Sequence, residues 1–197
     1  LPVIVGYDGF FTSHQKKRVE VFEEKAAVAR FVGSNKPEFS ILNTKEPITI
    51  GAYMNEPDFI NNKVQLCLAM DEAKQVIQDV FDEYKTVCGR ELQVSEGFYT
   101  EDCEVVMFAL GSSYSTVKKA VEDLRNKGIK AGAFTINVLR PSFFDEICNY
   151  CKSAKKVFII SDLVTNSSNM LKKLNSFLST SSFTKKLSCL ATVYSSL

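Results

Sequence analysis

The chain has 197 residues, with 24 Lys or Arg against 23 Asp or Glu, so its formal net charge at pH 7 is +1. A charge this close to zero gives neither the basic surface of a nucleic-acid-binding protein nor one attracted to anionic membranes. No apolar run approaches the ~20 residues that cross a bilayer, and 45% hydrophobic residues suit a soluble globular protein. We therefore expect no nucleic acid and no membrane among its partners.

The opening segment PVIVGYDG, residues 2–9, predicts a short buried strand that ends in a turn at Asp8 and Gly9. Residues 16–30 are highly charged, and residues 33–59 hold three of the five prolines, which predicts an extended connector. One strand and a charged helix bury too little apolar surface to offset about 1–2 kcal/mol of backbone entropy per residue. We therefore expect residues 1–45 to be the end of a domain completed by strands upstream or by another chain.

Residues 61–89 form the clearest helical pattern in the sequence. Asn61 or Asn62 is predicted to cap its start, and Gly89 to end it. At about 1.5 Å per residue the helix spans about 40 Å, a length that suits a brace between two units. The apolar residues on its predicted inner face are Leu66, Met70, Ala73, Ile77, Val80, Phe81 and Tyr84.

From residue 102 onward, apolar segments alternate with amphipathic ones. Strands are predicted at 103–113, 129–141, 155–162 and 185–196, and helices at 116–128, 142–154 and 167–180, with Gly128 stopping the first. Strands that alternate with helices of this length predict an α/β domain with a mostly parallel sheet and helices on both faces. The partial α/β fragment and the long helix precede this domain.

The six cysteines fall mostly inside apolar stretches, where a thiol behaves as a small buried hydrophobe. This usage favours a reducing, cytoplasmic location over a disulfide-stapled secreted domain. Cys148 and Cys151 form a CxxC within the helix predicted at 142–154, but no second pair has metal-ligand spacing. A metal site and a redox pair stay open as alternatives, and thiols in or near the core are the favoured interpretation.

Seven motifs in a fixed order resemble the 2-oxoacid:ferredoxin oxidoreductases over residues 1–162. The wording of the connector is most similar to the alpha subunit of the multi-subunit pyruvate enzymes. In chain order the motifs are DGFFTSH (8–14), EPITIG (46–51), CGREL (88–92), EDCE (101–104), GSSYST (111–116), LRNKGIKAG (124–132) and RPSF (140–143).

The resemblance implies that residues 1–60 are the end of the domain that binds the pyrimidine half of thiamine diphosphate. Residues 61–197 would be a second domain, including the long helix, similar to the C-terminal domain of transketolase. The family decarboxylates a 2-oxoacid oxidatively to an acyl-CoA, and electrons pass through iron–sulfur clusters to ferredoxin. Thiamine diphosphate and magnesium are its other cofactors, and the thiamine ring supplies the carbanion chemistry.

Few of the family's functional residues can be carried over to this chain. We find no match to its cofactor-activating glutamate, its diphosphate-and-magnesium motif or its ferredoxin-type CxxCxxCxxxC runs. We expect no catalytic, cofactor-binding or metal residue here and no cofactor bound by this chain alone. Family-motif or interface candidates are Asp8, Gly9, Ser13, His14 and Arg140. For Asp8, Ser13 and His14, hydrogen bonds that hold a sharp turn are the favoured interpretation, with a partner contact or an active-site acid at His14 as alternatives. Arg140 is an anion clamp, an interface contact or a solvent-facing residue.

Three functional hypotheses follow. The first is a structural and assembly part of the alpha subunit, inactive alone, with the other domains and subunits, ferredoxin and CoA as partners of the complete enzyme. The second is a non-catalytic α/β interaction module derived from that family. The third, a flavodoxin-like nucleotide binder, is disfavoured because Gly111 and Ser112 to Thr116 lack a phosphate-loop pattern and fit ordinary helix capping.

Overall fold

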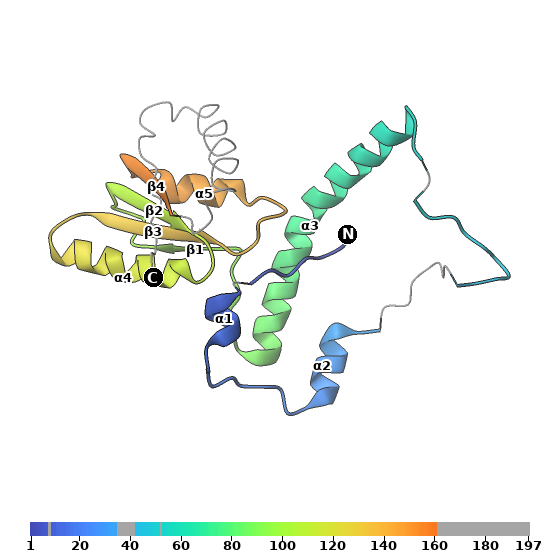
Figure 1. The fold of residues 1–197 in the computed structure, drawn as a ribbon, viewed down its shortest axis with the longest axis horizontal. Helices are drawn as coiled ribbons and strands as arrows, with labels where there is room; N and C mark the ends of the chain where they lie inside the picture. The colour runs from blue at the N-terminus through green and yellow to red at the C-terminus, as the bar shows by residue number, and fades with distance from the viewer. Residues whose placement is uncertain (8, 35–41, 52, 161–197) are drawn as a thin grey trace. The chain divides into compact units, whose positions relative to one another are not determined.

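The computed structural model describes residues 1–7, 9–34, 42–51 and 53–160 (Figure 1). Its contacts divide the chain into two compact units, Leu1 with Lys17–Leu92 and Pro2–Lys16 with Gln93–Leu197. The first unit holds α2 (Lys25–Val32) and α3 (Asp58–Cys88), and α1 (Phe10–His14) belongs to the second. The helix predicted at 167–180 and the strand predicted at 185–196 lie outside the described residues.

The second unit contains a four-stranded sheet. The strands are β1 (Ser95–Phe98), β2 (Val105–Ala109), β3 (Ala131–Ile136) and β4 (Lys156–Ile160), in the order β1-β3-β2-β4. β2 runs parallel to both β3 and β4, and β1 runs antiparallel to β3. The predicted mostly parallel α/β sheet is therefore confirmed, together with the three predicted strands that lie in the described residues.

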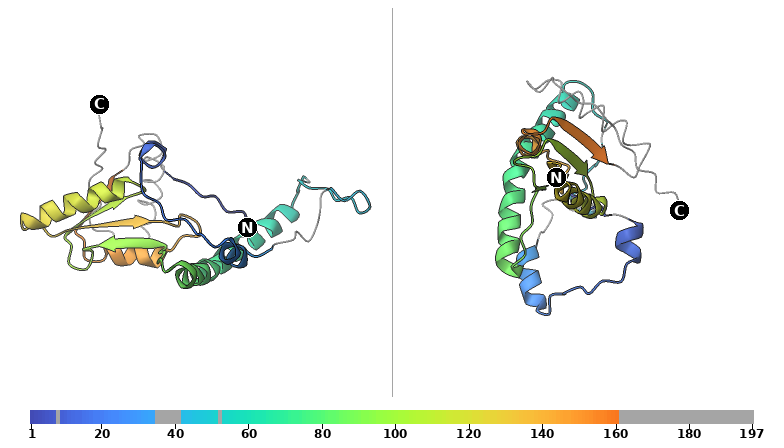
Figure 2. Two further views of the ribbon diagram at one scale, coloured as in Figure 1. Left: turned by 90° about the horizontal axis from the view of Figure 1, so that it is seen from below. Right: turned by 90° about the vertical axis from the view of Figure 1, so that its left-hand side faces the viewer.

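The helices α4 (Ser113–Asn126) and α5 (Phe144–Cys151) lie on opposite faces of this sheet (Figure 2). Each covers its own apolar cluster, since alternate residues of a strand point to opposite faces. The cluster beneath α5 contains Cys103, Val106, Phe108, Phe134, Ile147, Cys151, Val157 and Ile159. The cluster beneath α4 contains Ala109, Tyr114, Val117, Val121, Ala131 and Ala133. Both predicted helices are confirmed.

The long helix α3 starts earlier than the sequence predicts. Pro57 occupies its N-cap position without a side-chain cap, so the prediction that Asn61 or Asn62 caps the start is wrong, because both lie inside the helix. Gly89 ends α3 as predicted, with φ +69° and its N–H donating to the Lys85 carbonyl at 2.8 Å. No helix of the described ranges is both long and apolar enough to be a membrane span.

The predicted inner face of α3 is only half covered. Met70, Ala73, Ile77, Phe81 and Tyr84 are half-buried, and the two other members, Leu66 and Val80, are 40% and 42% exposed. The ring of Phe31 in α2 meets the ring of Tyr84 edge-on, with 5.9 Å between centroids. Within its own unit, α3 therefore buries no residue fully.

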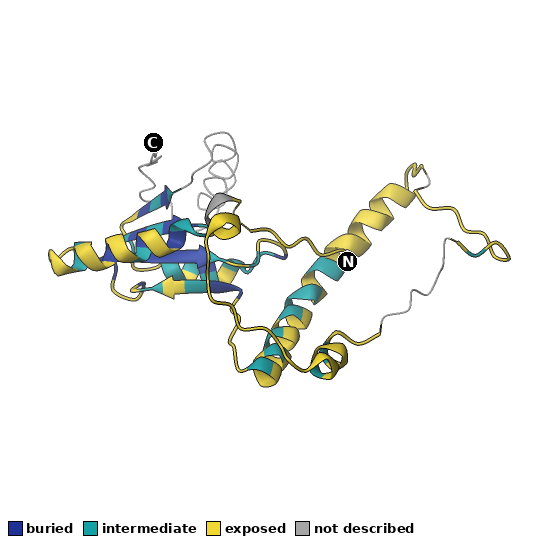
Figure 3. Ribbon diagram, turned by 60° about the horizontal axis from the view of Figure 1, so that its bottom comes forward, coloured by how far each residue is buried: buried dark blue, intermediate teal, exposed yellow. Residues whose placement is uncertain are grey.

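The opening segment does not form the predicted buried strand. Val3, Ile4 and Val5 are 85%, 95% and 83% exposed, and residues 1–7 belong to no strand. An extended apolar segment becomes a strand only where a neighbouring backbone pairs with it, and no described strand does so. Figure 3 shows how burial differs along the chain: the dark blue of buried residues is confined to the sheet and its immediate surroundings.

Candidate functional site

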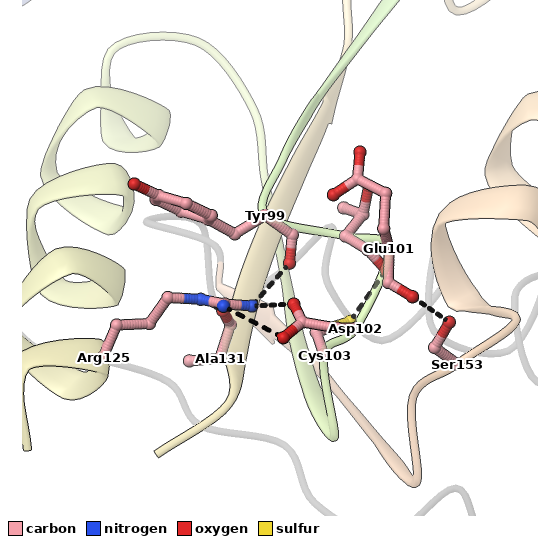
Figure 4. Close-up of polar contacts among 8 residues, drawn as sticks. Tyr99, Glu101, Asp102, Cys103, Arg125, Ala131 and Ser153 are labelled. Atoms are coloured by element: carbon pink, nitrogen blue, oxygen red, sulfur yellow. Dashed lines mark hydrogen bonds and ion pairs between the residues drawn. The ribbon is translucent and has the colours of Figure 1, made fainter. Parts of the chain in front are cut away.

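The most extensive polar network surrounds Arg125 in the last turn of α4 (Figure 4). Its guanidinium pairs with the Asp102 carboxylate at 2.6 Å and donates to the backbone carbonyls of Ala131 at 2.6 Å and Tyr99 at 3.0 Å. The hydrogen bond from Arg125 lowers the pKa of Asp102. One side chain thus ties α4, the start of β3 and the turn between β1 and β2 together.

The same turn is fixed by further close contacts. The Ser153 hydroxyl donates to the Glu101 carbonyl at 2.7 Å, and the Cys103 thiol donates to the Thr100 carbonyl at 3.3 Å. Tyr99 has φ +54°, and its ring lies 4.5 Å from the Arg125 guanidinium carbon. A side chain at Gly132 would place its Cβ 2.5 Å from the Tyr99 carbonyl oxygen, so only glycine fits this position.

The corner formed by Arg125 and the turn between β1 and β2 brings together two of the motifs that carry the family resemblance. Asp102 belongs to EDCE, and Arg125, Gly128 and Gly132 belong to LRNKGIKAG. Gly128 supplies φ +81° at the turn after α4. The corner lies at the amino ends of the parallel strands, whereas open α/β sheets bind ligands at the carboxyl ends. We therefore assign these motif residues to holding the fold, a role that the sequence analysis missed.

The edge strand β1 is held from both faces of the sheet. On the α5 face, the Ser95 hydroxyl hydrogen-bonds to the Tyr150 hydroxyl at 3.0 Å and donates to the Glu146 carboxylate. On the α4 face, the Tyr114 hydroxyl donates to the Glu96 carbonyl at 3.3 Å, and Lys118 pairs with the Glu96 carboxylate at 3.0 Å. Burial and the neighbouring Glu96 raise the pKa of Tyr114, which keeps its hydroxyl a donor.

The candidate residues from the sequence lie in two places. Asp8 is outside the described residues, and Gly9 is the N-cap residue of α1. Ser13 and His14 follow in α1, where the Ser13 hydroxyl lies 2.8 Å from His14 Nδ1 and both residues are exposed. Arg140 is exposed in the loop between β3 and α5. Their roles as family-motif or interface residues stay predictions.

At the start of α4, Ser112 lies at the N-cap position, as the capping interpretation predicts, but its side chain does not form the predicted capping hydrogen bond to the helix.

The cysteines of the CxxC lie on α5 as free thiols. Burial, with smaller effects from Cys148 and Cys103, raises the pKa of Cys151 to about 12, so this thiol stays protonated at neutral pH. Cys103 and Cys151 are buried and Cys88 and Cys148 are half-buried, which confirms thiols in or near the core for these four. Cys67 is exposed on α3 and does not fit that interpretation, and Cys189 lies outside the described residues.

Within the described ranges, no three Cys, His, Asp or Glu side chains form a group that could hold a metal ion.

The sheet with a helix layer on each face defines an open α/β domain. The comparisons with known proteins assign this domain: residues 103–192 match the family model described as pyruvate:ferredoxin oxidoreductase core domain II. Residues 1–82 match the model described as pyruvate flavodoxin/ferredoxin oxidoreductase, thiamine diphosphate-binding. The chain belongs to the pyruvate:ferredoxin oxidoreductase family, as the ordered motifs predicted.

Curated relatives include pyruvate synthase subunit PorA of Thermotoga maritima, 34% identical over 165 residues, which are 84% of this chain and 42% of the relative. PorA of Pyrococcus furiosus is 31% identical over 84% of this chain and 41% of its own length. Ketoisovalerate oxidoreductase subunit VorA of Pyrococcus abyssi is 31% identical over 81% of this chain and 40% of its own length. The chain thus spans less than half the length of these relatives.

Among solved structures, a 2-oxoglutarate:ferredoxin oxidoreductase from Magnetococcus marinus covers 61% of this chain with a TM-score of 0.40 and 18% identity. The matched part is 20% of that chain.

Proposed function

We propose that this chain is part of the alpha subunit of a 2-oxoacid:ferredoxin oxidoreductase, which decarboxylates a 2-oxoacid oxidatively to an acyl-CoA and passes electrons to ferredoxin. The observation that carries the proposal is the match of two successive models of one family to residues 1–82 and 103–192. The identity of the 2-oxoacid stays open, because relatives named for pyruvate and for ketoisovalerate match this chain at similar identity. Pyruvate is the first candidate, because both matching family models are named for it.

The role of this chain in the enzyme is structural. It completes the thiamine-diphosphate domain with residues 1–60 and braces assembly through residues 61–197, and it binds no cofactor and catalyses nothing alone. The exposure of every described residue before Val94 to at least an intermediate degree supports a role in which this part is covered by other domains or subunits. Ferredoxin and CoA act on the complete enzyme, and the free thiols favour the cytoplasm.

A segment exchange tests the proposal directly. The 165-residue segment of Thermotoga maritima PorA that matches this chain is replaced by the matching segment of this chain. The hybrid is assembled with its partner subunits and assayed for CoA-dependent oxidation of pyruvate and of ketoisovalerate. We expect an assembly of unchanged size that oxidises at least one of the two.

The matched control is the same hybrid with Phe134→Ala, which removes a fully buried ring and should prevent assembly. A hybrid that assembles at the correct size but oxidises neither acid would contradict the proposal and favour the non-catalytic interaction module. Calorimetry of this chain alone with thiamine diphosphate and magnesium should give no heat. Binding in the micromolar range would contradict the statement that the chain holds no cofactor alone.

A further inference from the structure

Lysines are concentrated at the amino edge of the sheet, where three neighbouring strands begin side by side. The Lys130 carbonyl accepts from the Glu104 N–H at 2.7 Å, and the Glu104 carbonyl accepts from the N–H groups of Lys155 at 2.8 Å and Lys156 at 3.2 Å. Residues at or just before the starts of β3, β2 and β4 therefore form one row. We use "basic edge" for the exposed lysines of this row and of the turns that lead into it, namely Lys127, Lys130, Lys152, Lys155 and Lys156.

The carboxylates of these turns neutralise only part of this charge. Asp102 is paired with Arg125, and Glu104 is paired with Lys155 at 2.9 Å. The charge of Lys130 contributes to lowering the pKa of both carboxyls, so this lysine lies within electrostatic range of each.

Glu101 is the remaining carboxylate of these turns. Its single negative charge compares with the four positive charges of Lys127, Lys130, Lys152 and Lys156. Because the whole chain carries a net charge of only +1, the excess is local and does not reflect a basic composition.

Helix stability explains only two of these lysines. α4 ends beside Lys127 and α5 ends at Lys152, and a cation at a helix C-terminus is favourable. That effect falls off beyond the last turn. Lys130 and Lys155 lie beyond it, immediately before strands, and Lys156 is the first residue of β4. Because Lys155 is paired with Glu104, the positive charges of Lys130 and Lys156 need another explanation.

We propose that the basic edge is a docking surface for an acidic face of a partner protein, a patch rich in Asp and Glu. Separate carboxylates on a protein can be placed opposite the lysines and away from Glu101, Asp102 and Glu104. The continuous phosphate charge of a nucleic acid would meet these three carboxylates as well. Charge complementarity of this kind mainly speeds association and selects the partner. This docking surface goes beyond the structural role proposed above.

The test uses the full chain with fluorescent poly-L-glutamate as the probe and single-stranded DNA of equal charge as the competing probe. An edge variant carries K127Q, K130Q, K152Q and K156Q. A matched control with the same change in charge carries K16Q, K17Q, K25Q and K45Q, all at exposed positions elsewhere. Because two of the edge lysines follow helices, the single variant Lys156→Gln is measured too, and urea unfolding confirms that each variant is folded.

At low salt, about 50 mM, we expect the edge variant to bind poly-L-glutamate about tenfold more weakly than the parent chain, and the control to stay within about twofold. Lys156→Gln should weaken binding by about twofold, and rising salt should weaken the parent chain more steeply than the edge variant. Equal losses in the edge variant and the control, or no binding by the parent chain, would overturn the proposal. Tighter binding of DNA than of poly-L-glutamate through the same lysines would also overturn it.

Discussion

Residues 93–160 and residues 1–92 differ in what they bury. The first region contains side chains that are completely enclosed, among them Val106 and Val121 at 0% exposure. In the second region no described residue is buried, and Val3, Ile4 and Val5 lie almost fully in solvent. Burial of one large apolar side chain contributes about 1.5–3 kcal/mol, so the stability of the described chain resides almost entirely in the sheet and its two helices.

The difference shows what separates a sequence that forms its own core from one that needs a surface supplied by other parts. Both regions contain apolar segments, and both contain helices. Among the described residues, strands from different parts of the sequence pair only within 93–160, which gives the helices there a surface to cover. The following substitutions test this comparison, from the largest expected effect to the smallest.

Phe134→Ala should destabilise the chain by about 3–5 kcal/mol, because it removes a buried ring and leaves a cavity. The Phe134 ring stacks with the rings of Phe108 and Tyr150, with 5.0 Å and 5.4 Å between centroids. Urea unfolding measures the loss of free energy. Ile4→Ala, in the exposed opening segment, is the control and should change the free energy by less than about 0.5 kcal/mol. Similar losses of unfolding free energy for the two substitutions would contradict the claim that stability resides in residues 93–160.

Gly132→Ala should cost about 1–3 kcal/mol through overpacking, and more than Gly97→Ala. At Gly132 the new Cβ meets the Tyr99 backbone carbonyl, which Arg125 holds in place. At Gly97 it meets the ring of Tyr150, and a side chain can shift where a fixed carbonyl cannot. Thermal unfolding of the two variants gives the ranking, and the reverse order would show that the corner around Arg125 is not rigid.

Asp102→Asn should make the stability of the chain less sensitive to acid. The pKa of Asp102 is lowered in the folded state, mainly by its hydrogen bond to Arg125. Its contribution is therefore complete above the unfolded pKa of about 3.9 and is lost as the pH falls through the lower, folded pKa. The urea midpoint, measured from pH 7 down to pH 3, should fall less steeply in the variant than in the parent chain.

Glu23→Gln makes the same change in charge at an exposed carboxylate and is the control for Asp102→Asn. If it flattened the acid dependence equally, the effect of Asp102→Asn would come from overall charge and not from the pair with Arg125.

Ile77→Ala should have the smallest effect, less than about 1 kcal/mol in the chain alone, because this residue of α3 is only half-buried. In the PorA hybrid the cost should rise, because other domains then cover the helix. Urea unfolding of the chain and the thermal midpoint of the hybrid measure the two values. A cost in the isolated chain as large as that of Phe134→Ala would mean that α3 already packs against a complete core.

The sequence predicted β2, β3 and β4 because strands covered on both faces appear as unbroken apolar runs. It missed β1, whose residues SEGF include a charge and a glycine, because tertiary contacts hold that strand: Glu96 with Lys118, and Ser95 with Tyr150. The opening VIV has the same local pattern as a buried strand. Its prediction was wrong because pairing depends on a neighbour that the pattern cannot reveal.

The contacts around Arg125 could not be predicted from the sequence either. Asp102 and Arg125 are 23 positions apart, and no local rule joins them. The spacing of Arg125, Gly128 and Gly132 in one motif was the available signal, because two glycines after an amphipathic helix indicate a special turn and a close backbone approach. The candidates Ser13, His14 and Arg140 were selected by resemblance, and their roles depend on partners that neighbouring residues do not specify.

Hydrogen exchange of the isolated 197-residue chain, followed amide by amide, tests most directly whether stability resides in residues 93–160. Amides of β2 and β3, such as those of Val106 and Phe134, should exchange only when the whole sheet unfolds. Those of residues 3–7 and of α3 should exchange through local opening, many times faster. Protection across α3 equal to that of Val106 and Phe134 would contradict the claim, because it would show that the amino-terminal region is stabilised by a core of its own.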